Sequence, residues 1–221
     1  MQKKIKIVGL GKFFQTIHLN YIKRKFKIIE CCDARKDLLK LFLKKNKIKK
    51  HYTNFEKLSK DNEYGISFCC SSRNSSFYIL KKLIPKNKFI FSEKPLVFNF
   101  KDAISLLNLS KKNNTNVKIG FMTRYDKSIL YLKKFLKKKK LINKIKKAEF
   151  ELSNNKLYIN KLNYIRTDES NDFAFSKSRY PKWLKNKDYI KYHIFINRYA
   201  HILNLSNFFF ENILPTNFDI K

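Results

Sequence analysis

Two glycines separated by one residue follow an apolar run at the start of the chain. KIKIVGL spans residues 4–10, Gly9-Leu10-Gly11 ends it, and apolar residues then recur at helical spacing from Phe13 to Lys25. A strand that ends in Gly-x-Gly and opens into a helix is typical of a dinucleotide-binding turn. The first glycine allows the tight turn, and the second lets a pyrophosphate approach the backbone at the helix N-terminus. The third small position of this pattern holds Phe14, which we expect to hinder close packing of the helix on the strand.

The first 120 residues continue this alternation of strand and helix. The strand-like apolar runs are FKIIECC (26–32), GISFCC (65–70), KFIF (88–91) and NVKIGF (116–121). Segments with helical spacing lie between them, at 36–45, 54–60, 75–84 and 102–112. Strands that are apolar on both faces belong to a buried parallel sheet. The sequence therefore predicts an α/β domain over residues 1–120, a Rossmann-type doubly wound parallel sheet.

The pattern changes after residue 120. A helix is predicted from about Tyr125 to Lys139, and LINKIKKAEFELS (141–153) then alternates as a half-solvated antiparallel strand does. Residues 166–190 have no clear period and are predicted to be loop, before helical spacing returns from Tyr192 to Phe210. We therefore expect an incomplete α+β domain over residues 121–221.

The net charge of +33 first suggests a nucleic-acid-binding protein. However, 43 of the 50 basic residues are Lys and only 7 are Arg, whereas phosphate and base recognition favours the Arg fork. Abundant Lys, Asn, Ile and Phe are what an AT-rich coding sequence produces without selection on charge. We therefore predict no specific nucleic-acid partner.

No apolar run approaches the ~18 residues of a membrane span, and the N-terminus has too few apolar positions for a secretory signal. These features predict a cytoplasmic protein with no membrane partner. The four cysteines form two adjacent pairs, Cys31-Cys32 and Cys69-Cys70, without the spacing of zinc or redox sites. We expect reduced thiols on core strands and no metal site.

The predicted turn and the next strand end supply candidate cofactor ligands. Lys12 and Phe13 belong to the glycine turn, and Asp33 lies 22 residues after Gly11 at the end of the second apolar run. A carboxylate there can accept ribose hydroxyls, or it can cap the following helix. Arg35 and Lys36 nearby would instead favour a 2′-phosphate, so the sequence leaves NAD and NADP open.

The loop SSRNSS (71–76) lies at the same predicted edge of the sheet. Ser71 and Asn74 could contact the cofactor ribose, and a plain capping turn is an equal alternative. SEKPLV places Glu93, Lys94 and Pro95 at the mouth of the next strand.

Taken together, these motifs resemble one protein family. GLGKFFQTIHL, Asp33, SEKPLV, GFMTRYD and the N-x-x-x-H of Asn197 and His201 occur in the order and spacing of the Gfo/Idh/MocA oxidoreductases. E-K-P is the most specific of these elements. The resemblance covers essentially the whole chain and implies an NAD(P)-dependent oxidoreductase that transfers hydride to or from a sugar-type small molecule.

The resemblance also implies roles for individual residues. Lys94 would lie beside the nicotinamide and the substrate and would be catalytic. Glu93 and Pro95 would lie at the cofactor, and this proline is often cis in the family. His201 would be the general acid/base, a role that suits an imidazole at neutral pH. Asn197 stands where the family has Asp; it shares a helix face with His201, and both would contact substrate. Arg124, from GFMTRYD, would also contact substrate.

Three departures from the family pattern keep a second interpretation open. Phe14 replaces a small residue, and Ser76 stands where a His is usual. In the family, the helix that corresponds to the one with His201 is followed by several strands that complete an open sheet, whereas here NILPTNFDIK follows it. The alternative is a non-catalytic dinucleotide-binding remnant of such an enzyme. In the family that open sheet is a common dimer surface, so a homo-oligomer is also possible.

Overall fold

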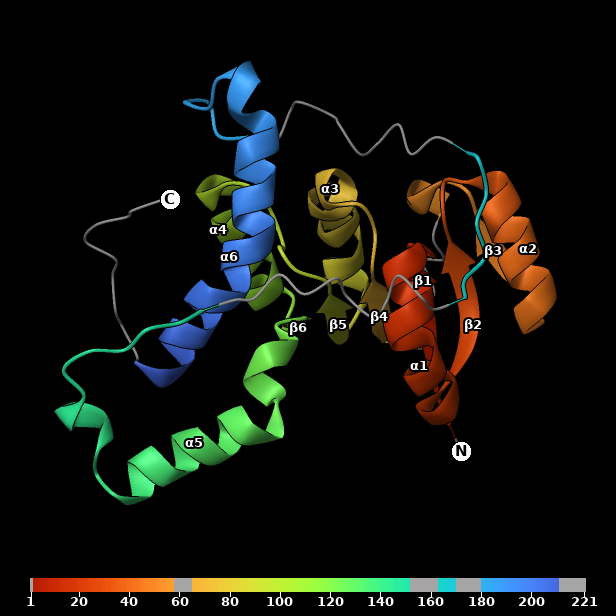
Figure 1. The fold of residues 1–221 in the computed structure, drawn as a ribbon. Coiled ribbons are helices and arrows are strands. Elements are labelled where there is room, and N and C mark those ends of the chain that lie inside the picture. Colours follow the sequence, from red (N-terminus) through yellow and green to blue (C-terminus); the bar gives the residue numbers. More distant parts are fainter. Residues whose placement is uncertain (1, 58–64, 152–162, 170–179, 211–221) are drawn as a thin grey trace. The chain divides into compact units, whose positions relative to one another are not determined.

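The computed structural model describes residues 2–57, 65–151, 163–169 and 180–210 (Figure 1). Contacts divide the chain into two compact units, each treated by itself below. The first contains Met1–Gly120 and Lys156–Lys185, and the second contains Phe121–Asn155 and Asn186–Lys221. The grouping of 156–185 with the first unit differs from the expected division at residue 120, which remains a prediction.

A six-stranded parallel sheet forms the centre of the first unit. Its strand order is β3-β2-β1-β4-β5-β6. The strands are β1 (Lys3–Val8), β2 (Phe26–Cys32), β3 (Lys50–Tyr52), β4 (Ile66–Cys69), β5 (Phe89–Ser92) and β6 (Asn116–Ile119). The chain builds outward from β1 to β3 and then crosses over to β4. This confirms the predicted doubly wound Rossmann sheet and places its switch point between β1 and β4, where such folds bind ligands.

The helices of this unit follow the predicted alternation. They are α1 (Leu19–Lys25), α2 (Lys36–Asn46), α3 (Arg73–Leu83) and α4 (Phe100–Lys112), with short turns η1 (Phe14–His18), η2 (Phe55–Lys57) and η3 (Ile84–Lys86). Strand β3 was not predicted, because its three residues, Lys-His-Tyr, carry no apolar run. It lies at the edge of the described sheet, where it pairs with β2.

Each face of the sheet has its own apolar core. One cluster joins Ile5, Ile7 and Phe68 to α1 and α2, and the other joins Val8 and Ile90 to α3 and α4. Successive strand residues point to opposite faces. The cysteine pairs are divided in the same way: Cys31 and Cys32 belong to different clusters, as do Cys69 and Cys70. All four are free thiols, as predicted.

Burial gives a first test of this core. Desolvation raises the pKa of all four thiols, that of Cys32 to about 12. Because the thiolate is the reactive form, we expect iodoacetamide at pH 8 to modify the native protein slowly and all four cysteines rapidly once guanidinium unfolds it. Mass spectrometry of the alkylated chain measures both states. Rapid modification of Cys31 or Cys69 in the native state would contradict the described core.

Phe14 does not prevent the first helix from packing. Its ring is fully buried and lies against Phe42, with centroids 6.1 Å apart. The chain from Phe14 to His18 is wound as a π-helix, which continues into α1. π-Helical turns are rare and frequently occur at functional sites. The wider turn accompanies a large side chain at a position where the pattern has Gly or Ala.

In the second unit the described secondary structure is helical. It contains η4 (Met122–Tyr125), α5 (Lys127–Lys138), η5 (Ile142–Lys144), η9 (Asn186–Asp188) and α6 (Tyr189–Phe209). Residues 145–151 form no strand, so that prediction is wrong for the described part of LINKIKKAEFELS. A strand needs a hydrogen-bonded partner, and none lies beside these residues in the described chain.

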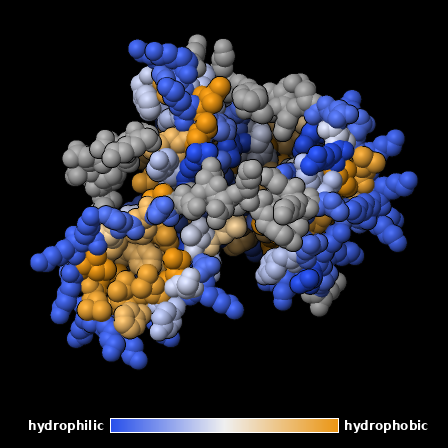
Figure 2. Space-filling view, in the orientation of Figure 1, coloured by the Kyte–Doolittle hydropathy of each residue, from blue (hydrophilic) through white to orange (hydrophobic). Residues whose placement is uncertain are grey.

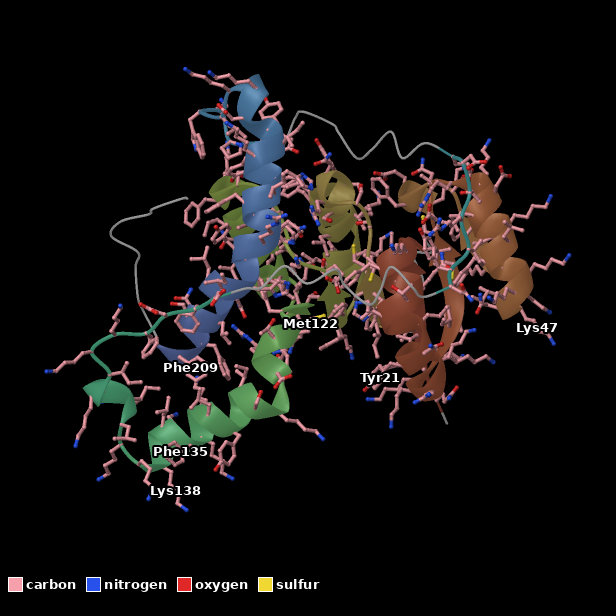
Figure 3. All side chains as sticks on the ribbon, viewed as in Figure 1. Tyr21, Lys47, Met122, Phe135, Lys138 and Phe209 are labelled. Carbon is pink, nitrogen blue, oxygen red and sulfur yellow. The ribbon has the colours of Figure 1, made fainter. Side chains whose placement is uncertain are left out.

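Helix α5 is amphipathic and exposed on much of its surface. Leu130, Tyr131, Leu132 and Phe135 are all exposed. Figure 2 shows hydrophobic residues gathered over this unit with hydrophilic residues around them, and in Figure 3 Lys138 extends outward from the end of α5. No helix in the described ranges combines the length and apolar character needed to cross a bilayer.

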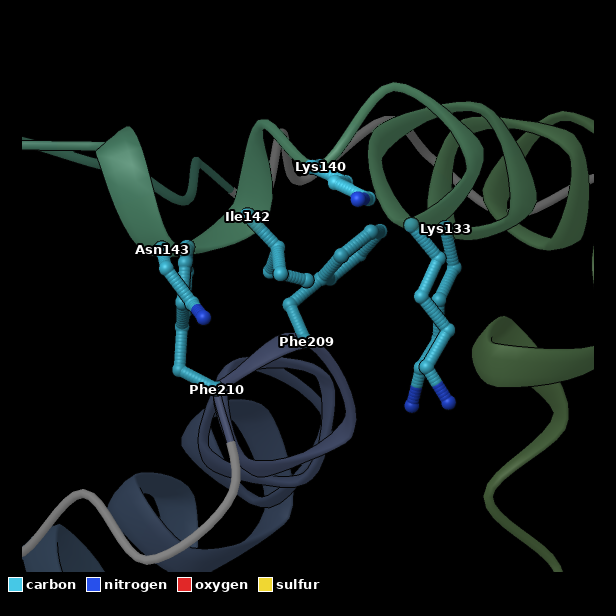
Figure 4. Close-up of a pocket in the computed structure, with 7 residues that line it drawn as sticks. Lys133, Lys140, Ile142, Asn143, Phe209 and Phe210 are labelled. Atoms are coloured by element: carbon cyan, nitrogen blue, oxygen red, sulfur yellow. The ribbon is translucent and has the colours of Figure 1, made fainter.

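A hollow of about 660 Å³ lies within the second unit, lined mainly by Lys133, Lys137, Lys140, Ile142 and Phe209. Figure 4 shows the Phe209 ring extending from α6 between Ile142 and Lys133. None of the predicted site residues lines this hollow.

Candidate functional site

The backbone at Gly9 passes closer to β4 than any side chain would allow. A Cβ at Gly9 would lie 2.4 Å from the Cys70 carbonyl oxygen and 2.6 Å from the Ser71 nitrogen, and Gly9 has a φ of +89°. At Gly11 the nearest atom to such a Cβ would be Arg35 Nη2, at an ordinary 3.6 Å. Gly9 is thus required by the fold itself. At Gly11 a Cβ would touch the end of the flexible Arg35 side chain and no described backbone atom, so a phosphate group could approach the backbone there.

We therefore expect substitution by Ala to affect the thermal stability strongly at Gly9 and weakly at Gly11. We expect Gly9→Ala to lower Tm strongly or prevent folding, because it combines backbone strain of about 1–3 kcal/mol with a backbone clash. Gly11→Ala should change Tm by only a few degrees. Thermal unfolding followed by circular dichroism measures both, and equal losses would contradict the close contact.

Asp33 lies where β2 ends and accepts four hydrogen bonds. Its Oδ2 accepts from Leu10 N (2.7 Å) and Arg35 Nη2 (2.8 Å), and its Oδ1 accepts from Arg35 N (3.0 Å) and Nε (2.9 Å). The carboxylate is buried. The N-cap of α2 is Arg35, so the alternative interpretation of Asp33 as that cap is wrong. Asp33 instead joins the glycine turn to the end of β2.

The loop after β4 separates its two candidate residues. Ser71 is half-buried, and its hydroxyl lies 3.5 Å from that of Ser76. Asn74 is buried in the first turn of α3, whose N-cap is Ser72. Ser71 is therefore the more exposed of the two residues, and its backbone nitrogen lies close to Gly9. Asn74 is the weaker candidate.

Glu93, Lys94 and Pro95 follow β5 and reach the same edge. Glu93 N donates to Cys69 O (3.0 Å), so the segment is fastened to the end of β4. The Lys94–Pro95 peptide is cis, as the resemblance implied. Glu93 Oε2 accepts a hydrogen bond from Lys94 N (3.2 Å). The carboxylate thus fixes the backbone that carries the predicted catalytic lysine.

His18 was not singled out from the sequence. Its Nε2 lies 2.6 Å from Glu93 Oε1, and its ring contacts Phe68 and Phe91 edge-on. A Cβ at Gly120 would lie 3.0 Å from the same Glu93 oxygen, so Gly120 leaves room for the pair. His18 belongs to the quoted segment GLGKFFQTIHL, which was the available signal. Through Glu93, it holds the Lys94 segment to the first helix.

The charges around Lys94 act on its pKa in opposite directions. Desolvation lowers the pKa, the nearby Arg73 guanidinium lowers it further, and the Glu93 carboxylate raises it, with a net lowering. The neutral amine is thus reached at a lower pH than for an exposed lysine.

Two substitutions should therefore move the pKa of Lys94 in opposite directions. Arg73→Met removes a positive charge and should raise it, whereas Glu93→Gln removes a negative charge and should lower it. NMR titration of ¹³C-labelled lysine measures both, with the Lys94 signal assigned by its loss in Lys94→Met. Shifts of the same sign in both variants would contradict the described electrostatics.

A segment from far along the chain also reaches this edge within the first unit. Ile165 N donates to Gln15 Oε1 (3.0 Å), and Gln15 Nε2 donates to Leu10 O (2.7 Å). Lys12 Nζ lies 5.3 Å from the centre of the Tyr164 ring. We call residues 163–169 the strap. No sequence motif marks these residues, although part of this segment falls in the loop predicted over 166–190.

The predicted substrate residues lie in the second unit. Asn197 and His201 are four residues apart on α6 and share a helix face. His201 Nδ1 lies 3.3 Å from Thr123 Oγ1. Arg124 Nε donates to Asn204 Oδ1 (2.9 Å), so η4 brings Arg124 to α6 one turn beyond His201. Thr123 and Asn204 are additions that the sequence did not indicate.

Fold and site together define a dinucleotide-binding α/β protein. Residues 3–121 match the profile of the Gfo/Idh/MocA group, described as an oxidoreductase family with an NAD-binding Rossmann fold. The chain belongs to this family. Its resident cofactor is accordingly NAD or NADP, and the glycine turn fits such a group, because at Gly11 only the end of the flexible Arg35 side chain, among the described residues, lies near the position of a Cβ.

Curated relatives are similar to part of the chain. A myo-inositol 2-dehydrogenase of Thermotoga maritima is 29% identical over 132 residues, which are 59% of this chain and 39% of the relative. An inositol 2-dehydrogenase of Salmonella typhimurium is 28% identical over 141 residues, 62% of this chain and 42% of the relative. The chain thus matches about two fifths of the length of these relatives.

Solved structures show the same fold. A probable dehydrogenase from Thermotoga maritima has a TM-score of 0.57 at 27% identity, over 62% of this chain and 41% of that one. A scyllo-inositol dehydrogenase from Lactobacillus casei, solved with NAD(H) and scyllo-inositol, has a TM-score of 0.54 at 20% identity, over 63% and 42%. The second likeness concerns the fold alone.

Proposed function

We propose that this chain carries the cofactor-binding and proton-transfer residues of an NAD(P)-dependent oxidoreductase acting on a polyol or sugar-type carbon. The observation that carries the proposal is that Gly9, Asp33 and Lys94 follow the carboxyl ends of β1, β2 and β5, at one edge of the parallel sheet. The inositol 2-dehydrogenases among the relatives support a substrate rich in hydroxyl groups.

The first unit would bind the dinucleotide. Gly11 leaves space for the pyrophosphate at the helix start, and Asp33 and Ser71 lie at the strand ends where a ribose binds. When bound, the nicotinamide supplies or accepts the hydride. Lys94 would orient the substrate oxygen by hydrogen bonding, and its lowered pKa eases loss of its own proton.

The second unit would carry the residue that accepts the substrate proton. His201 is the proposed base that takes the hydroxyl proton at Nε2, because its Nδ1 already faces the Thr123 hydroxyl. Asn197 cannot ionise; it would orient a substrate hydroxyl from the same helix face, which leaves proton transfer to His201 alone. Arg124, held by Asn204, would hold a second substrate oxygen.

The second candidate is a dinucleotide-binding protein without turnover. Asn197 favours it, because an amide stands where the family has a carboxylate. Binding and turnover measured separately distinguish the two. NADH binding without oxidation of any inositol or aldose by NAD⁺ or NADP⁺ would favour this second candidate.

Substitution of the proposed catalytic pair provides the direct test. We expect Lys94→Met and His201→Asn each to reduce kcat by about 10²-fold or more, the effect of lost acid–base assistance, with little change in NADH affinity. The exposed Lys101 and His51 provide matched controls, Lys101→Met and His51→Asn, which should keep full activity. Turnover is followed at 340 nm. Unchanged kcat in both active-site variants would overturn the assigned roles.

A further inference from the structure

The N-terminus of α2 already holds an anion from the chain itself. Glu169 Oε1 accepts a hydrogen bond from Asp37 N (3.0 Å), and Glu169 Oε2 accepts one from Leu38 N (3.0 Å). Thr167 Oγ1 donates to the same Oε2 (3.1 Å). The two amides are otherwise unsatisfied donors of the first helical turn, the groups that bind phosphates in many proteins.

The position of this carboxylate bears on the choice of cofactor. Asp33 ends β2, and α2 begins three residues later at Lys36. In a dinucleotide-binding sheet the adenosine ribose lies at the end of this strand, so a 2′-phosphate would extend toward the start of the following helix. NADP would therefore need the space and the N–H donors that Glu169 occupies.

Resting on the proposed dinucleotide site, we propose that Glu169 is a specificity-determining residue that makes the chain select NAD(H) over NADP(H). Its carboxylate occupies the donors of α2 and repels a 2′-phosphate. Asp33 places a second carboxylate beside the ribose. Arg35, the residue that would otherwise attract the phosphate, directs its Nε and Nη2 to Asp33.

The strap fixes Glu169 in this place. Gln15, itself buried, binds both backbone groups of Ile165: Ile165 N donates to Gln15 Oε1 (3.0 Å), and Gln15 Nε2 donates to Ile165 O (3.4 Å). The Tyr164 ring has the cationic groups of Lys12 and Arg166 near it, at 5.3 and 4.8 Å from its centre. Glu169 is thus joined through one short segment to the glycine turn and to α2. The choice between a 2′-hydroxyl and a 2′-phosphate would thus depend on Glu169, in a segment far along the chain, as well as on Asp33 at the end of β2.

Binding measurements test this without any need for turnover. Titrations with NADH and NADPH, followed by calorimetry, should show tighter binding of NADH by the unmodified chain. Glu169→Gln should strengthen NADPH binding by about tenfold, a change of about 1.4 kcal/mol, and leave NADH binding within about threefold. The exposed neighbour Asp168 supplies the matched control, because Asp168→Asn removes the same charge one residue away.

A comparison on the unmodified chain does not depend on any variant folding. Adenosine 2′,5′-bisphosphate should bind more weakly than 5′-AMP. Equal or tighter binding of the 2′-phosphorylated nucleotides, or equal gains in Glu169→Gln and Asp168→Asn, would overturn the inference while leaving the proposed function intact. Failure of both NADH and NADPH to bind the folded chain would overturn the proposed function and this inference with it.

Discussion

The contact between Gly9 and the Cys70–Ser71 peptide is the constraint on which the candidate site depends. It brings the end of β1 against the end of β4 with no side chain between them, at the switch point of the sheet. Next to Gly9, Leu10 N donates a hydrogen bond to Asp33. At the end of β4, the Cys69 carbonyl oxygen accepts a hydrogen bond from Glu93 N. Four strand ends, those of β1, β2, β4 and β5, are thus joined by backbone and carboxylate contacts before any ligand is considered.

Carboxylates are scarce in this chain, with 17 Asp and Glu against 50 Lys and Arg, yet several of them gather at this edge. Asp33 is held by Arg35, Glu93 by His18, and Glu169 by two helix amides. Buried or half-buried carboxylates require such partners, because their desolvation is otherwise costly. Most of the described lysines are exposed, and hydrophilic residues cover much of the face seen in Figure 2. The acidic groups, rather than the net charge, thus order the proposed cofactor site.

The sheet could be predicted because its buried strands are local apolar runs, and β2 begins and ends where FKIIECC does. Strand β3 could not, since three polar-flanked residues become a strand only by pairing with β2. Gly9 and the E-K-P segment were identifiable for the same local reason. His18 and Glu169 were harder, because their partners Glu93 and α2 lie 75 and about 130 residues away in the chain. The strand expected near residue 145 was wrong because alternation of side chains does not supply a partner strand.

In the proposed function, the first unit binds the cofactor and the second unit transfers the proton, and the contacts of Lys94 and His201 fit these separate tasks. Lys94 is positioned through Glu93 and His18 within the first unit, and His201 lies beside Thr123 within the second. Under the proposed function, a change such as Asn197 in place of Asp would therefore act on proton transfer, because it alters a side chain of α6 and none of the contacts that hold Lys94 to Glu93 and His18. The proposed cofactor site depends largely on backbone contacts at the strand ends, whereas the proposed proton transfer depends on single side chains of one helix. A fold of this kind can keep its geometry while substitutions at such side chains change the chemistry.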